Sequence, residues 1–75
     1  MERKKIGRNL FPYEMLLDYA QVMADINMTL ALKVFAAKVS IQESHGNHTD
    51  AYAAVVDTYD DGTVDVLPVP ATYQL

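Results

Sequence analysis

The chain has 75 residues, no cysteine and a formal net charge of −4, and 51% of its residues are hydrophobic. This length allows one domain with a marginal core, and the lack of cysteine excludes disulfides, thiolate metal sites and thiol nucleophiles. The hydrophobic share argues against disorder throughout and favours an interface shared with another subunit or protein.

Basic and acidic residues are concentrated at opposite ends of the chain. Residues 1–8 carry four basic side chains against one acidic, a net charge of +3. The four basic residues are Arg3, Lys4, Lys5 and Arg8. Residues 43–75 carry six acidic side chains and no Lys or Arg. We therefore expect a basic flexible arm over residues 1–8 and an acidic C-terminal half.

Residues 9–42 have the pattern of amphipathic helix. Asn9 is a good N-cap residue, and Pro12 is tolerated in a first helical turn. Apolar residues then recur at steps of three and four, which predicts a helix with one buried side. These residues are Leu16, Tyr19, Ala20, Met23, Leu30, Val34, Ala37 and Ile41. The polar sequence around residues 25–27 leaves open whether the segment is one long helix or two consecutive helices.

A second apolar stripe runs along the later part of this segment. Its residues fall well away from the first stripe on a helical wheel, and they are Met28, Leu32, Phe35 and Val39. A helix that is apolar on two sides needs two covers, and in so short a chain the second cover is most simply another subunit. We therefore predict a symmetric homodimer with these four residues at its interface.

The same stretch has a competing interpretation as a β-strand. The residues "MTLALKV", 28–34, alternate in the way a half-buried strand does. Ala, Leu, Lys and Met dominate the stretch, however, and all four rank high in helix propensity. The composition therefore favours a helix.

The segment "ESHGNHTD", residues 43–50, contains both histidines of the chain. His45 and His48 with nearby carboxylates are weak candidates for a metal site, because imidazole and carboxylate groups bind zinc and other divalent ions. Gly46 and Asn47 stand between them and break a helix, and the segment is rich in turn formers. We interpret it as a polar loop and expect no metal ion and no other cofactor.

Residues 51–70 predict an antiparallel β-hairpin. Two runs rich in Val and Tyr flank the turn sequence Asp60-Asp61-Gly62. Pro68 and Pro70 cannot donate ladder hydrogen bonds, so the second strand lies at an edge or ends there. Residues 71–75 form a tail. The predicted fold is a single α+β domain over residues 1–75, with the helices first and the C-terminal hairpin after them.

The sequence contains no recognisable catalytic or targeting motif. It has no phosphate loop, no dinucleotide-binding glycine motif and no nucleophile elbow, and so small a core leaves little room for a pocket. We expect no enzymatic activity. No signal peptide is evident, and the most apolar window, residues 26–41, is too short to span a bilayer. We therefore expect a cytoplasmic protein without membrane contact.

The leading hypothesis is a small acidic protein-interaction module. In its general composition the chain resembles the orphan proteins of phages and mobile elements, and the hypothesis includes a small inhibitor or regulator that acts on a host protein. A cluster of carboxylates on the hairpin would face a basic surface of that partner. The residues of this cluster are Asp57, Asp60, Asp61 and Asp65.

The alternative hypothesis belongs to another functional class. A small dimeric regulator associated with nucleic acid would use the basic arm, residues 1–8, to contact phosphates. Four positive charges give only a modest electrostatic attraction, and the acidic remainder of the chain repels nucleic acid. A protein partner is therefore favoured over nucleic acid.

Overall fold

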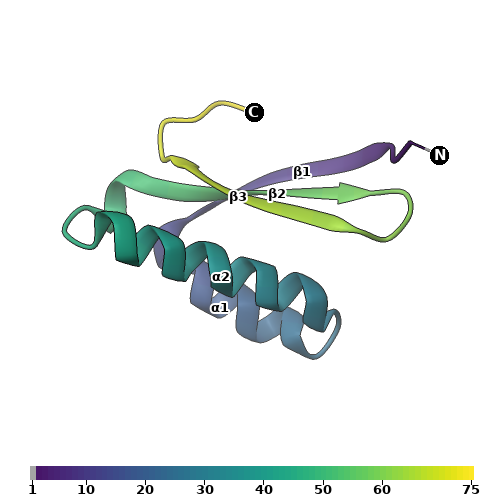
Figure 1. The fold of residues 1–75 in the computed structure, drawn as a ribbon, viewed down its shortest axis with the longest axis horizontal. Helices are drawn as coiled ribbons and strands as arrows, with labels where there is room; N and C mark the ends of the chain where they lie inside the picture. The colour runs from purple at the N-terminus through teal and green to yellow at the C-terminus, as the bar shows by residue number, and fades with distance from the viewer. Residues whose placement is uncertain (1) are drawn as a thin grey trace.

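The computed structural model describes residues 2–75 and shows an α+β fold that opens with a strand (Figure 1). Strand β1 spans Lys5–Pro12, helix α1 Tyr13–Ala24 and helix α2 Met28–His45. A single 3-10 turn, η1 at Thr49–Ala51, leads into strand β2 at Tyr52–Tyr59, and strand β3 is Val64–Pro70. The strands form one antiparallel sheet in the order β1-β2-β3, and both helices lie on the same face of it.

The predicted order of elements, helices first and then a hairpin, is wrong at the N-terminus. Residues 5–12 form β1, where we expected the end of a flexible arm and the first turn of a helix. In β1, Arg8 lies opposite Asp57 and Phe11 opposite Ala54 of β2. The pairing partners are more than forty residues apart in the chain, so no local pattern announces them. Residue 1 of the expected arm lies outside the described residues.

The sequence "NLFP", residues 9–12, ends the strand and precedes the helix. Pro12 has φ −57° and an extended ψ of 150°, so it occupies the N-cap position of α1 and not its first turn. Asn9, which we took for the N-cap, pairs with Val56 inside the sheet. Proline fixes φ near the value shared by extended and helical chain, so one residue serves both the end of β1 and the start of α1.

Two consecutive helices, and no strand, occupy residues 13–45. The break falls at residues 25–27, where Asn27 caps α2 by accepting a hydrogen bond from the Leu30 backbone N–H at 3.1 Å. Helix α2 continues to His45 and so takes in the first three residues of the expected polar loop. The last part of that loop contributes Thr49 and Asp50 to η1.

The core lies between the two helices and the sheet. The first apolar stripe of the sequence faces inward there, because its residues are all buried or half-buried. Leu16 and Val34 are 0% exposed, and Val56 of β2 is 1% exposed. The buried residues of this core are Leu16, Ala20, Leu30, Val34, Ala37, Ile41, Ala54, Val56 and Val64.

The hairpin of β2 and β3 forms where the turn sequence predicts it. Gly62 has φ +85°, a left-handed conformation that strongly favours glycine. The outer edge of β3 is closed to further strand pairing, because Pro68 and Pro70 lack N–H groups and Lys33 Nζ donates to the Val64 carbonyl at 2.6 Å. Residues 71–75 turn back above the face of the sheet opposite the helices (Figure 1).

Candidate functional site

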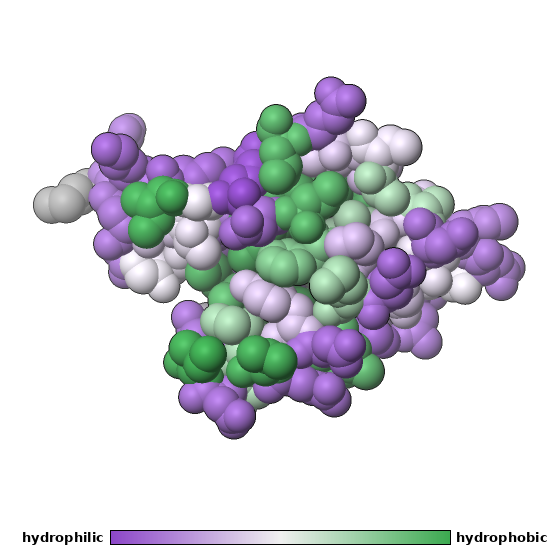
Figure 2. Space-filling view, turned by 180° about the vertical axis from the view of Figure 1, so that it is seen from behind, coloured by the Kyte–Doolittle hydropathy of each residue, from purple (hydrophilic) through white to green (hydrophobic). Residues whose placement is uncertain are grey.

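The outward side of the two helices exposes large apolar side chains. Leu17 on α1 and three residues on α2 keep 40–61% of their surface in contact with solvent. The three residues on α2 are Met28, Leu32 and Phe35. We call these four residues the helical face. Figure 2, seen from behind, shows a few hydrophobic side chains exposed among hydrophilic ones in the helical layer, at the lower left of the molecule.

A shallow groove of about 300 Å³ follows the helical face between α1 and α2. Leu17 and Gln21 line it from α1, and Met28, Leu32 and Phe35 line it from α2. Gln21 is the one polar residue in its wall, and the remaining wall residues are alanines. A groove with large apolar ridges and small floor residues suits the packing of a protein segment.

The structure brings three of the four predicted interface residues together. Met28, Leu32 and Phe35 share the groove, and Val39 is half-buried one turn further along α2. The contribution of α1 was missed by sequence reasoning. Leu17 directly follows the core residue Leu16, and only the packing of α1 against α2 brings its side chain into the same groove as Met28 and Leu32.

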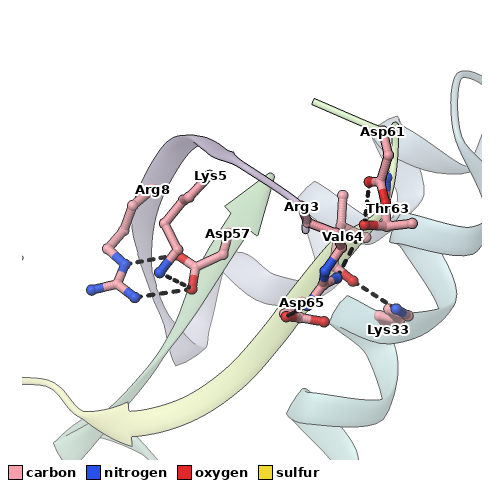
Figure 3. Close-up of polar contacts among 9 residues, drawn as sticks. All are labelled: Arg3, Lys5, Arg8, Lys33, Asp57, Asp61, Thr63, Val64 and Asp65. Atoms are coloured by element: carbon pink, nitrogen blue, oxygen red, sulfur yellow. Dashed lines mark hydrogen bonds and ion pairs between the residues drawn. The ribbon is translucent and has the colours of Figure 1, made fainter. Parts of the chain in front are cut away.

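A second group of functional candidates lies on the sheet, where basic and acidic residues meet. Asp57 on β2 is 3% exposed and binds Arg8 of β1 in a two-pronged ion pair with distances of 2.7 and 3.0 Å. Lys5 Nζ lies 3.2 Å from the same carboxylate. Figure 3 shows both basic side chains pointing toward Asp57. The hydrogen bonds from Arg8 hold the pKa of Asp57 below its ordinary value, despite burial.

Arg3 binds the other strand of the hairpin. Its guanidinium donates to Asp65 and to the Thr63 hydroxyl, both at 3.0 Å, and lies 3.9 Å over the ring of Tyr59. Figure 3 shows Arg3 beside Asp65. The hydrogen bond from Arg3 lowers the pKa of Asp65. Lys4 contributes its backbone N–H, which donates to the Asp60 carboxylate at 2.9 Å.

The predicted acidic surface is therefore divided by the fold. Asp57 turns toward β1, and Asp65 is half-exposed and paired with Arg3. Asp60 and Asp61 are exposed at the hairpin tip, where Asp61 accepts hydrogen bonds from Thr63 that lower its pKa. The outward negative charge is thus concentrated at the tip.

The two histidines have different surroundings. His45 ends α2, and its ring stacks on Tyr52 of β2 with the ring centroids 3.9 Å apart. The backbone N–H of His48 donates to the His45 carbonyl at 2.8 Å in the following turn. Among residues 2–75, no three His, Asp or Glu side chains gather closely enough to hold a metal ion. The stacking gives His45 a structural role at the junction of helix and sheet.

Another depression of the surface lies between α2 and β3 and has a volume of about 430 Å³. Its two charged residues already have partners, because Lys33 donates to the Val64 carbonyl and Asp65 accepts from Arg3. Within the described residues, no buried side-chain nitrogen or oxygen lacks a hydrogen-bond partner. The helical face remains the stronger candidate site, because its groove is lined almost entirely by apolar residues.

Comparison of the chain with protein-family models, with curated proteins and with solved structures finds no match. Within residues 2–75, neither helix combines the length and the apolar character that crossing a membrane requires.

Proposed function

We propose that this protein is a non-enzymatic protein-interaction module that binds other protein through the helical face. The observation that carries the proposal is the apolar groove between α1 and α2, with Leu32 61% and Met28 55% exposed beside it. Burying apolar surface contributes about 25 cal/mol per Å², so covering these side chains gives a substantial driving force for association. Single exposed apolar residues are common on proteins, but a groove lined by several of them marks an interaction site.

We propose regulation of a host protein as the biological role of this module, with the acidic tip of the hairpin, not the helical face, directed at that protein. The chain is small, acidic and free of recognisable catalytic motifs, which suits an inhibitor or regulator that acts by occupying a surface. The exposed carboxylates of Asp60 and Asp61 would steer it toward a basic partner and would raise the association rate more than the affinity. A chain without cysteine suits a reducing compartment, and we propose the cytoplasm as the place of action.

Binding of nucleic acid by the basic segment receives less support from the contacts. Arg8 and Lys5 are engaged by Asp57, and Arg3 is engaged by Asp65. A phosphate would have to compete with these carboxylates, and four nearby acidic side chains would repel it. Nucleic-acid binding is therefore tested only as a control, by measuring the binding of the protein to DNA and RNA at low salt.

A photo-crosslinking amino acid placed in the helical face tests the proposal in the cell that makes the protein. We expect a crosslinker at position 32 to give abundant adducts with protein, either a second copy or another polypeptide, identified by mass spectrometry. The matched control is position 22, because Val22 is 63% exposed and lies roughly 140° around α1 from Leu17 at 100° per residue. Adducts at position 32 that are no more abundant than those at position 22 would overturn the proposed function.

A further inference from the structure

The outward row of α2 has the spacing of a coiled-coil seam. Met28, Leu32, Phe35 and Val39 follow one another at steps of four, three and four residues. This is the alternation of d and a positions in a heptad repeat. The residues on the opposite side of the helix, including Leu30 and Val34, are buried against the sheet. The row therefore points away from the sheet, where a partner helix could approach it.

No charge interrupts this row where a symmetry axis would pass. Lys33 lies between Leu32 and Phe35 in sequence, but its Nζ turns toward β3 and donates to the Val64 carbonyl at 2.6 Å (Figure 3). The flanking residues Ala31 and Ala36 are small and let a second helix come close. A two-fold axis brings each residue near its own copy, so a charged row would repel itself, whereas this one is self-complementary.

The charges beside the row distinguish between two ways of pairing. The side of α1 that faces away from the sheet carries exposed Glu14, Asp18 and Asp25. If the two α2 helices packed antiparallel and face to face, each α1 would lie over the other α1, and these carboxylates would meet their copies. If the two α2 helices run parallel, the α1 helices lie on opposite sides of the seam. Like charges are then kept apart, which favours the parallel arrangement.

The e and g positions, which flank the seam, carry opposite charges that face each other in the parallel arrangement. With Leu32 and Val39 at a positions, Lys38 occupies a g position and Glu43 the e position of the following heptad. In a parallel pair these two positions face each other across the interface, once on each side of the seam. Within residues 2–75, the contacts of the Lys38 ammonium group are a 3.4 Å hydrogen bond to Gln42 and the rings of Tyr13 and Phe35. The ammonium group is therefore available to a carboxylate of a second copy.

We propose that a second copy of this chain covers the helical face, with the two α2 helices packed in parallel about a two-fold axis. This inference rests on the proposed function and names its partner. At roughly 200 Å² per large side chain, the four residues of the helical face expose on the order of 400 Å² per copy. Two copies bury on the order of 800 Å² from these residues alone, and the rim residues extend this toward the roughly 1,200 Å² of the smallest stable interfaces.

The mass of the purified protein in solution tests the dimer. Sedimentation equilibrium at tens of micromolar protein is expected to give twice the chain mass for the wild type, and the mass of one chain for Leu32→Glu. The control is Val22→Glu, which adds the same charge at an exposed position away from the groove and should remain dimeric. All three proteins should show the same helical circular dichroism, because Leu32 and Val22 are both outside the core.

Mixing charged variants tests the direction of the helices. In the parallel arrangement Leu32 meets Leu32 of the other copy, so Leu32→Glu and Leu32→Lys are each monomeric and form a heterodimer when mixed. In an antiparallel arrangement Leu32 would face Phe35 instead, and Leu32→Glu would pair with Phe35→Lys. A heterodimer from the second mixture alone would overturn the parallel arrangement.

Failure of the inference can be separated from failure of the proposed function. A monomeric wild type at hundreds of micromolar, or a Leu32→Glu variant that remains dimeric, would overturn the second copy as the partner. If crosslinks from position 32 then reach a different protein, the proposed function stands with another partner. If position 32 also gives no specific adduct, both are overturned.

Discussion

The charged side of the sheet and the helical face present opposite situations. On the sheet, the basic residues of the N-terminal segment meet the acidic residues of the hairpin, and Asp57 with Arg8 is the central pair. On the helices, Leu32 and its neighbours keep about half of their apolar surface exposed to solvent. Folding thus pairs basic residues of the N-terminal segment with carboxylates of the hairpin, while apolar side chains on the helices remain exposed to solvent. This difference is the reason why we propose the helical face, and not the charged side of the sheet, as the surface that binds other proteins.

The largest loss of stability is expected from the inner side of α2. Ile41 is 1% exposed in the core, so Ile41→Ala should lower the free energy of unfolding by about 2–5 kcal/mol through lost burial and a residual cavity. Urea denaturation followed by circular dichroism, at one fixed protein concentration, measures the change. Gln42→Ala, at the exposed neighbouring position, is the control and should leave the midpoint nearly unchanged. Equal effects of the two substitutions would contradict the assigned orientation of α2.

A smaller but clear loss of stability is expected when the buried carboxylate of Asp57 in the sheet is removed. Asp57→Asn keeps the shape of the side chain but leaves Arg8 and Lys5 without their carboxylate. We expect a lower thermal midpoint, measured by circular dichroism at neutral pH. Asp50→Asn, at an exposed position before β2, should behave as the wild type. An Asp57→Asn variant as stable as the wild type would show that the ion pair contributes nothing net.

The pH dependence of stability gives a second test of the contribution of the Asp57 ion pair. The pKa of Asp57 is lowered in the folded state, chiefly by the hydrogen bonds from Arg8. Its stabilisation is therefore fully present above the unfolded pKa, near 4, and is lost as the pH falls through the lower folded pKa. Thermal midpoints measured between about pH 5 and pH 2 should fall less steeply for Asp57→Asn than for the wild type. Some dependence will remain, because the pKa values of Asp61 and Asp65 are lowered as well.

The smallest effect on thermal stability is expected from the exposed ion pair of Arg3 and Asp65. The side chains of Arg3 and Asp65 are 40% and 39% exposed, so solvent and salt screen their ion pair. Arg3→Ala should shift the thermal midpoint only slightly at low salt and not at all at high salt. A shift as large as that of Asp57→Asn would indicate that Arg3 also matters through its packing on the ring of Tyr59.

The candidate site was partly visible in the sequence. The three- and four-residue spacing around α2 separates an inner stripe containing Val34 and Ile41 from an outer one containing Leu32 and Phe35. The structure buries the first and exposes the second. Leu17 could not be assigned, because its place in the groove shared with Leu32 depends on how α1 packs against α2. No helical period can predict which side of one helix another helix will cover.

The sequence by itself determined the elements whose signals are local. Asn27 caps α2 three residues from its partner Leu30, and Gly62 permits the hairpin turn between adjacent strands. Only the tertiary structure decided the role of residues 5–12. Their strand exists because β2 lies beside it, and Arg8 meets Asp57 across 49 positions of the chain. A helix makes its hydrogen bonds within itself, whereas an edge strand borrows them from a distant partner, so the basic segment looked like a free arm until the sheet was known.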